Sequence, residues 1–197
     1  MNLTPNIIKE TSRGIDCIRI EDELLKTREV FLTDAVDTDT MNSLFKQLMY
    51  LNRESPEEEI TLYINSPGGE VRSGLAVYDY LKLMPAPLRT VCIGTAASMG
   101  AILFLAGDKR EMLPHSQLMI HDPAPSGGSM QGMKPEQLEE NLKSLKKVQQ
   151  VLCGIISEKT GKSVKEIQKI TRKDTYFDAE EALKFGLATE TIKNFLI

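Results

Sequence analysis

The chain has 197 residues, of which 41% are hydrophobic and 26% are charged, so it can enclose a substantial core and global disorder is excluded. Acidic residues outnumber basic ones by 28 to 24, which gives a formal net charge of −4. No run of lysine or arginine forms a phosphate-binding stripe, which argues against nucleic acid as a partner. We expect one domain over residues 1–197, beginning with a short segment that ends near residue 20.

Cysteine content and the absence of sorting signals indicate the compartment. Cys17, Cys92 and Cys153 form neither a CxxC pair nor a disulfide framework, and two histidines are too few to complete a zinc set. We therefore expect buried or half-buried free thiols in a reducing, cytoplasmic compartment. The N-terminus lacks a secretory signal, and the uncharged stretch 90–107, rich in small residues, favours a buried strand, turn and helix over a membrane span.

Strand-like and helix-like segments alternate along the chain. Strands are expected at residues 30–32, 60–64, 90–93 and 118–121. Apolar residues at helical spacing predict helices at residues 41–51, 71–81 (ended by Pro85 and Pro87), 98–106 and from Pro135 to about Lys159. Capping-box patterns at Ser163/Glu166 and Asp178/Glu181 mark two further helix starts. This alternation predicts an α/β fold with a mostly parallel sheet.

A serine lies where an apolar strand meets an apolar helix, in the sequence GTAASMGA. Ser98 then occupies the start of the helix, where backbone amides favour developing negative charge, as in a nucleophile elbow. The motif is not GxSxG, because Ala96 occupies the position of the first glycine. Ser98 is therefore either a nucleophile or a serine that caps the helix.

The segment Asn65-Ser-Pro-Gly68-Gly69 follows a predicted strand. Its glycines permit positive φ and expose backbone amides, which suits an oxyanion hole or a shelf for an extended peptide. A tight turn between strand and helix explains the same residues.

A serine nucleophile needs a base, and the chain offers two imidazoles. His115 lies in a predicted loop and is expected to be exposed. His121 ends the apolar run Leu118–Ile120, where a rigid strand can hold it at a cleft. A partly buried histidine bonded to backbone is the other interpretation of His121.

The candidates for the acid that would orient the histidine are reduced by elimination. Asp122 points away from His121 in an extended chain. Asp108 is expected to form solvated pairs in a turn with Lys109 and Arg110, and Asp178 is expected to cap a helix. Asp174 has no such local role, which leaves a triad of Ser98, His121 and Asp174.

Over nearly its whole length the sequence resembles the family of proteolytic subunits of the ATP-dependent Clp protease. The matching segments are ETSRG (10–14), LLKTREVFL (24–32), LYINSPGG (62–69), SGLAVYD (73–79), GTAASMGA (94–101), LMIHDP (118–123) and EALKFGLA (181–188). The resemblance implies a crotonase-like spiral of ββα units with a protruding handle helix within residues 122–160. It also implies a serine peptidase that forms heptameric rings, stacked in pairs, and cleaves unfolded polypeptides inside their chamber.

The resemblance also assigns roles to single residues. Ser98 falls on the nucleophile, His121 on the base and Asp174 on the acid, and the amides of Gly68 and Met99 fall on the oxyanion hole. The partner would be a hexameric AAA+ unfoldase that uses ATP. This chain has no Walker motif, and we expect it to hold no cofactor or metal.

Departures from the family pattern suggest a divergent paralogue. Asp122 stands where the family usually has glutamine, and an extra carboxylate there is able to compete for the orientation of His121. Thr175 replaces an arginine that commonly pairs between rings. The loop from Ala124 to Gly132 is longer than usual, so we expect weaker ring stacking.

The family's docking groove for the unfoldase is apolar and aromatic. Tyr63, Leu83, Val91 and Ile93 keep that character here, whereas Thr61 and Glu111 replace aromatic residues. A charge in an apolar pocket is unfavourable for binding, so altered docking of the activator is expected.

Two other functions compete with a self-contained peptidase. One is a partner-dependent or scaffold subunit that joins a paralogue in mixed rings. The other is an acyl-CoA hydratase or isomerase of the wider crotonase-like group, in which the triad has no evident task.

Overall fold

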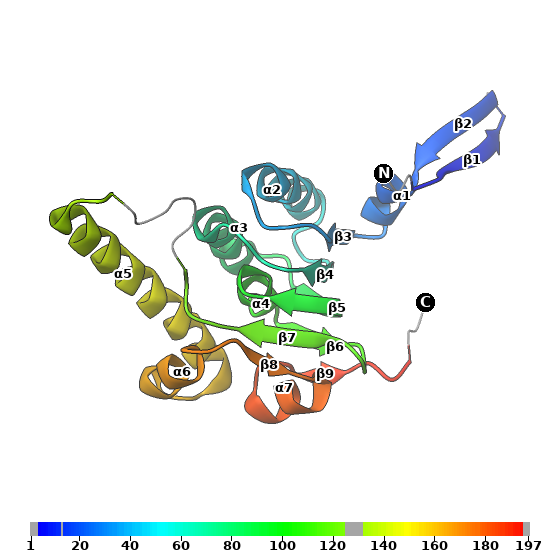
Figure 1. Ribbon diagram of the computed structural model, residues 1–197. Helices are drawn as coiled ribbons and strands as arrows, with labels where there is room; N and C mark the ends of the chain where they lie inside the picture. The colour runs from blue at the N-terminus through cyan, green and yellow to red at the C-terminus, as the bar shows by residue number, and fades with distance from the viewer. Residues whose placement is uncertain (1–3, 13, 125–131, 195–197) are drawn as a thin grey trace.

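The computed structural model describes residues 4–12, 14–124 and 132–194. Its strands are β1 (Asn6–Thr11), β2 (Gly14–Arg19), β3 (Glu29–Leu32), β4 (Ile60–Ser66), β5 (Leu88–Ala97), β6 (Lys109–Met112), β7 (Gln117–Ile120), β8 (Thr175–Phe177) and β9 (Glu190–Thr191). Its helices are α1 (Ile20–Lys26), α2 (Thr38–Glu54), α3 (Val71–Leu83), α4 (Met99–Phe104), α5 (Pro135–Thr160), α6 (Val164–Ile170) and α7 (Ala179–Phe185). Figure 1 shows the β1–β2 hairpin and helix α5 projecting from opposite sides of the body.

The main sheet is mostly parallel, as expected. Strands β3, β4, β5, β6 and β9 lie side by side in that order, and all four pairings between them are parallel. Strand β7 also pairs parallel with β5, and β8 runs antiparallel to β7. The α/β class is therefore confirmed, and the projecting helix agrees with the spiral and handle that the resemblance implies.

Strand β5 is longer than the expected 90–93 and changes its neighbour along its length. Its first half pairs with β6, from Arg89↔Lys109 to Cys92↔Met112. Its last residues pair with β7, from Thr95↔Gln117 to Ala97↔Met119. Small residues of low strand propensity continue the strand here because β7 provides a backbone partner, which no local pattern reveals.

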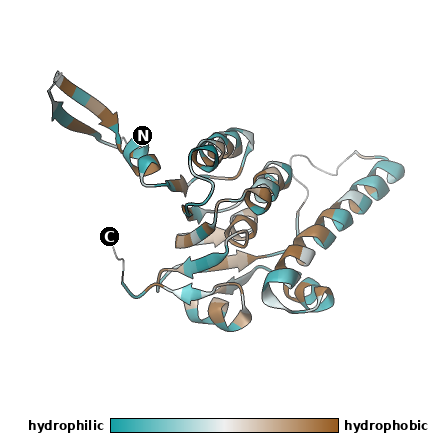
Figure 2. Cartoon of the chain, turned by 180° about the vertical axis from the view of Figure 1, so that it is seen from behind, coloured by the Kyte–Doolittle hydropathy of each residue, from teal (hydrophilic) through white to brown (hydrophobic). Residues whose placement is uncertain are grey.

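Helices α2 and α4 pack against the sheet, and α3 packs against both of these helices. Helix α2 begins at Asp37, whose carboxylate accepts from the Thr40 N–H at 2.8 Å, and α3 ends before the two expected prolines. All six residues of α4 are buried. Hydrophobic segments gather on the central strands and the helices beside them, whereas hydrophilic and hydrophobic bands alternate along α5 (Figure 2).

The long helix α5 confirms the helix expected from Pro135 to about Lys159. Its second half is anchored by buried side chains, which are Leu152, Cys153, Ile155 and Ile156. Its first half is largely exposed, and Gly161 ends it with φ 70°. Both expected capping boxes are also present, with Ser163 and Asp178 accepting from the backbone three residues later.

The N-terminal region contains structure that sequence analysis does not predict. Strands β1 and β2 form an antiparallel hairpin from Asn6↔Arg19 to Thr11↔Gly14. Its residues Ile8 and Ile15 are 71% and 72% exposed, because no side chain of the described ranges covers them. Cys17 on β2 is exposed, so the expectation of buried or half-buried thiols is wrong for this cysteine and confirmed for the other two.

The segment after α4 differs from the expected solvated turn. Asp108 accepts from the backbone N–H of Leu88 at 3.0 Å, instead of pairing with its basic neighbours. Arg110 is buried and donates to the carbonyl oxygens of Leu187, Gly107 and Gly186. Three backbone acceptors offset the cost of burying this guanidinium. The charges of neighbouring residues in the sequence do not indicate whether such an arginine is buried or exposed.

Among the described residues, no helix combines the length and apolar character needed to cross a lipid bilayer.

Candidate active site

Ser98 occupies the sharp connection between β5 and α4. Its backbone has φ 54° and ψ −118°, a conformation that non-glycine residues rarely adopt. Its N–H donates to the carbonyl oxygen of Met119 at 2.8 Å, which ties the connection to β7. The side chain makes no capping hydrogen bond to α4, so the interpretation of Ser98 as a helix cap is wrong and its hydroxyl is free for other contacts.

His121 is brought to Ser98 by the pairing of β5 with β7. Because Ala97 lies opposite Met119, the residues that follow the two strand ends lie close together. The Nε2 atom of His121 lies 2.8 Å from the Oγ atom of Ser98. The imidazole side chain is 27% exposed, so it faces both the serine and solvent.

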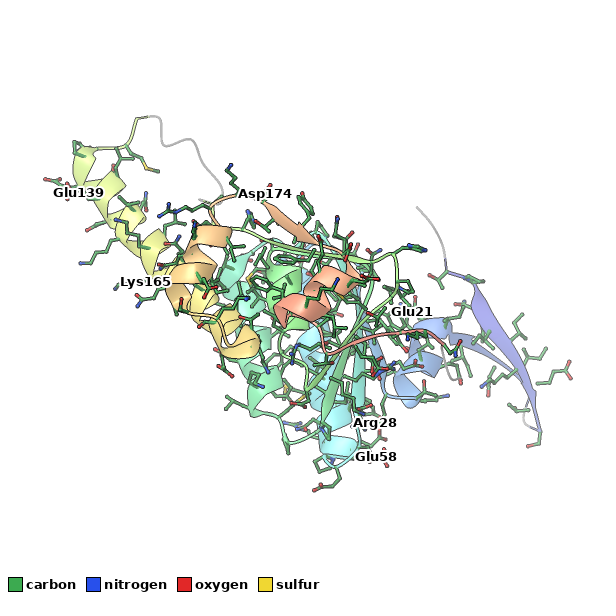
Figure 3. All side chains as sticks on the ribbon, turned by 90° about the horizontal axis from the view of Figure 1, so that it is seen from below. Glu21, Arg28, Glu58, Glu139, Lys165 and Asp174 are labelled. Atoms are coloured by element: carbon green, nitrogen blue, oxygen red, sulfur yellow. The ribbon has the colours of Figure 1, made fainter. Side chains whose placement is uncertain are left out.

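Asp174 is placed by the antiparallel pairing of β7 with β8. Ile120 lies opposite Thr175, and continuing this register by one residue sets Asp174 beside His121. The Oδ1 atom of Asp174 lies 3.4 Å from the Nδ1 atom of His121. The carboxylate is 61% exposed, and Figure 3 shows it at the edge of the molecule, between α6 and β8. The structure therefore brings the three predicted side chains together, with a longer contact on the acid side.

Gly68 lies against the backbone of the β5–α4 connection that contains Ser98. It has φ 84°, and a Cβ atom there would lie 2.5 Å from the Ala97 carbonyl oxygen, 2.7 Å from the Ser98 Cβ and 2.8 Å from the Met99 nitrogen. Only glycine satisfies both the dihedral angle and the space. Gly68, whose amide is expected at an oxyanion hole together with that of Met99, therefore packs against the Ser98–Met99 backbone.

The two amides differ in their present partners. The N–H of Gly68 donates to the Oγ atom of Ser66 at 3.2 Å. Met99 is the first residue of α4, where no carbonyl of the helix is available to accept its N–H. Gly69 forms a parallel bridge with Val36, so the segment is both a turn and a short piece of paired strand.

A mainly apolar pocket opens beside the serine and histidine. It is lined by Val71, Ser98, Ile102, Ile120, His121, Asp122, Pro123, Leu152, Cys153, Ile156 and Thr171. Burial raises the pKa of the Cys153 thiol, and the nearby Asp122 raises it further. A protonated thiol is a poor nucleophile, so Ser98 is the better candidate for reaction within this pocket.

Asp122 does not compete for the histidine ring. Its Oδ1 accepts from the Thr171 hydroxyl at 2.6 Å and its Oδ2 accepts from the Gln149 side-chain amide at 2.7 Å. Within the described ranges, Asp174 is the carboxylate that lies within 4 Å of His121. Sequence analysis does not identify Thr171 or Gln149, because no motif marks them and Thr171 is 49 residues from Asp122.

The other singled-out residues lie away from this cluster. His115 is exposed, as expected, and borders a polar hollow with Asp178 and Glu180. Among the described residues, no group of three or more histidine, cysteine, aspartate or glutamate side chains is placed to hold a metal ion.

Glu111, expected to be an unfavourable charge in an apolar groove, is neutralised. Its carboxylate accepts from the Arg89 guanidinium at 2.6 Å, and both side chains are largely buried. The neighbouring Tyr63 donates to Glu29 at 2.9 Å and stacks on Phe31, with ring centroids 5.0 Å apart. Burial, followed by the Glu29 carboxylate, raises the pKa of Tyr63. This surface therefore carries hydrogen-bonded polar side chains next to the stacked rings of Phe31 and Tyr63.

A comparison with protein families finds one match that spans almost the whole chain. The family model described as Clp protease matches residues 12–195. The match includes the serine connection, both partner side chains and all seven helices of the described chain.

Proposed function

The chain belongs to the Clp protease family, and from this membership and the geometry at Ser98 we propose that it is a serine endopeptidase. The observation that carries the proposal is the 2.8 Å approach of His121 Nε2 to Ser98 Oγ, made by a serine that does not cap its helix. A nucleophile and base within hydrogen-bond distance, with a third group behind the base, is the arrangement that activates a serine.

In the proposed reaction, the Ser98 oxygen attacks the carbonyl carbon of a peptide bond while His121 Nε2 accepts the hydroxyl proton. Asp174 faces Nδ1 and favours the tautomer that carries its proton there, leaving Nε2 free to act as a base. His121 then donates the proton to the leaving amine. Water, activated by the same imidazole, hydrolyses the acyl-enzyme and restores Ser98.

The oxygen anion of the tetrahedral intermediate would be held by the N–H groups of Gly68 and Met99. Their closeness to Ser98 supports this role. The Gly68 amide donates to Ser66 in this structure, so the substrate has to replace that acceptor. The Ser66 hydroxyl itself donates to the Asp34 carbonyl at 2.6 Å, which keeps Ser66 in place during the exchange.

Unfolded polypeptides are the proposed substrates. The pocket beside Ser98 has mostly aliphatic walls, so an apolar side chain on the acyl side of the cleaved bond would contact them. Its volume of about 20 Å³ holds about one water molecule, so the walls have to move apart before a side chain enters. The Gly68-Gly69 segment, already paired with Val36, offers backbone groups to an extended chain.

Proteins of this family work as ring oligomers with Clp unfoldases, and we propose heptameric rings of this chain, stacked in pairs, fed by a separate AAA+ unfoldase that uses ATP. The projecting α5 and the exposed apolar residues Leu142, Val151 and Tyr176 support contact between subunits. Thr175 donates to Ile170 and Lys173 within the same chain and offers no charge to another ring. Native mass spectrometry at low protein concentration tests the expected weak stacking, and stable double rings would contradict it.

A second candidate, a subunit that needs a paralogue in a mixed ring, is favoured by one observation. The 3.4 Å between Asp174 and His121 is longer than a usual hydrogen bond, and the carboxylate is 61% exposed. A neighbouring subunit is able to close that contact. The acyl-CoA alternative gives the Ser98–His121 pair no task, and the family match favours a peptidase.

Hydrolysis of a fluorogenic, unstructured peptide with an apolar residue before the cleaved bond tests the proposal. We expect turnover by the wild type and none by Ser98→Ala. Turnover that appears only after a paralogue is added supports the mixed-ring candidate, and equal turnover by Ser98→Ala contradicts both.

A further inference from the structure

Asp122, the residue after the predicted base His121, makes hydrogen bonds that have no part in the proposed catalytic steps. Both side-chain oxygens of Asp122 accept, one from the Thr171 hydroxyl at 2.6 Å and the other from the Gln149 amide at 2.7 Å. The backbone adds a further bond, from the Asp122 N–H to the Thr171 carbonyl oxygen at 2.6 Å. Thr171 is 2% exposed, so water competes weakly for these bonds.

These bonds join three separate parts of the fold. Asp122 directly follows His121 at the end of β7, and Thr171 ends α6 three residues before Asp174. Gln149 belongs to α5, one helical turn before Cys153, whose Sγ lies 3.9 Å from the Thr171 hydroxyl. The segments that carry the predicted base and acid are thus fastened to each other and to one face of α5.

The acid side of the triad is otherwise held by a short strand pairing and by the Thr175 hydroxyl, which donates to Ile170 and Lys173. Asp174 is 61% exposed, and its contact with His121 is 3.4 Å long. Strand β8, which follows Asp174, has three residues. The spacing between His121 and Asp174 therefore also depends on what secures the chain beside each of them. Asp122, directly after His121, and Thr171, three residues before Asp174, are bonded to each other there.

We propose that Asp122 is a positioning residue for the reaction, acting through Thr171 and Gln149 to align His121 with Asp174. It does not touch the reacting atoms. This inference rests on the proposed serine peptidase function, since alignment matters only if the pair is catalytic. The connection also makes the alignment depend on where α5 lies.

Two matched pairs of variants of the full-length protein test this inference. Thr171→Val removes the hydroxyl and keeps the shape, whereas Thr171→Ser keeps the hydroxyl. Gln149→Leu removes the amide donor, whereas Gln150→Leu makes the same change at the exposed neighbour. For the peptide substrate, we expect Thr171→Val and Gln149→Leu to lower kcat by about tenfold or more with little change in KM, because small misplacements of catalytic groups are costly. Thr171→Ser should keep more of the wild-type kcat than Thr171→Val does, because it retains the hydroxyl, and Gln150→Leu should stay close to wild type.

Hydrogen–deuterium exchange gives a readout that needs no activity. Segments 118–123 and 171–177 should exchange faster in Thr171→Val and Gln149→Leu than in their controls. Unchanged kcat in both variants, while Ser98→Ala is inactive, overturns the positioning role and leaves the peptidase proposal standing. If the wild type shows no Ser98-dependent turnover, the peptidase proposal fails separately, and the positioning role fails with it.

Discussion

The backbone N–H of Ser98 donates to the carbonyl oxygen of Met119 at 2.8 Å. This bond joins the strained connection after β5 to the strand that precedes His121, so the proposed nucleophile and base are located by one sheet pairing. The proposed acid comes from the next pairing, of β7 with β8. Three neighbouring strands therefore bring together side chains that are far apart in sequence, each on the residue directly beside a strand end.

Two separate substitutions of aspartates should distinguish a residue needed for catalysis from one needed for stability. We expect Asp174→Asn to lower kcat by about 100-fold to 10,000-fold, because the orienting charge behind His121 is lost. Unfolding should be little affected, since the side chain is 61% exposed. Asp178→Ala should lower the free energy of unfolding by about 1 kcal/mol through loss of its cap and keep kcat. Peptide kinetics and thermal melting measure both, and full activity of Asp174→Asn would contradict its assignment.

The space around Gly68 predicts the effect of one methyl group. Gly68→Ala places a Cβ within 2.8 Å of Ala97, Ser98 and Met99 at a positive φ, so it should displace the serine and lower its labelling by a fluorophosphonate on the order of 100-fold.

The matched control is Gly154→Ala within α5, where no atom of the described residues, apart from the adjoining helix backbone, lies within 4 Å of the added carbon. It should keep wild-type labelling and stabilise the helix by about 0.5 to 1 kcal/mol. Equal labelling of the two variants would show that Gly68 does not support Ser98.

The buried pair of Arg89 and Glu111 changes how the docking prediction is tested. Glu111→Phe alone leaves the Arg89 guanidinium without its partner, which is costly in a largely buried place. We expect the double variant Arg89→Met/Glu111→Phe to need about tenfold less Clp unfoldase for half-maximal stimulation of peptide hydrolysis.

The control for the docking prediction is Lys109→Met, which removes an exposed charge from the same strand as Glu111. Identical stimulation curves for the wild type and the double variant would remove Glu111 as a determinant of docking.

Lys159 gives a prediction for the dependence of stability on pH. Burial, followed by the nearby Lys82, lowers the pKa of Lys159 from 10.5 to about 8. Between these values the unfolded chain binds more protons than the folded one, so the free energy of unfolding rises as the pH rises from about 8 toward 10.5. Below pH 8 the charged amine is present in both states, and its burial opposes folding.

Lys159→Met should therefore raise Tm at pH 7 and raise it less at pH 10. Lys143→Met, an exposed change on the same helix, should show neither effect. Melting curves at the two pH values test this, and a gain in Tm that does not vary with pH would contradict it.

Local patterns predict most of the helices and the candidate triad, for physical reasons. Helical spacing, prolines and capping boxes act within a few residues, so α2, α3, α5 and α7 can be recognised without the fold. The triad follows from residue types at strand ends and from the family resemblance. The structure brings Ser98, His121 and Asp174 together, and their catalytic roles remain proposals.

The features that sequence analysis misses depend on distant partners. Strand β5 extends to Ala97 because β7 lies beside it, and the burial of Arg110 is tolerated because the carbonyl oxygens of Gly186 and Leu187 accept hydrogen bonds from it. The β1–β2 hairpin has little apolar alternation to mark it. The hydrogen-bond partners of Asp122 are 27 and 49 residues away in sequence. From sequence, the position of Asp122 next to His121 suggests that it competes for the imidazole, whereas in the fold its carboxylate bonds to Gln149 and Thr171.

The central claim is that Ser98 is an activated nucleophile, and intact-mass analysis after incubation with a fluorophosphonate tests it most directly. Wild type and Ser43→Ala, a change at an exposed serine on α2, should each gain one adduct per chain, and Ser98→Ala should gain none. An adduct on Ser98→Ala, or none on well-folded wild-type protein assembled with its partner subunits, would contradict the account.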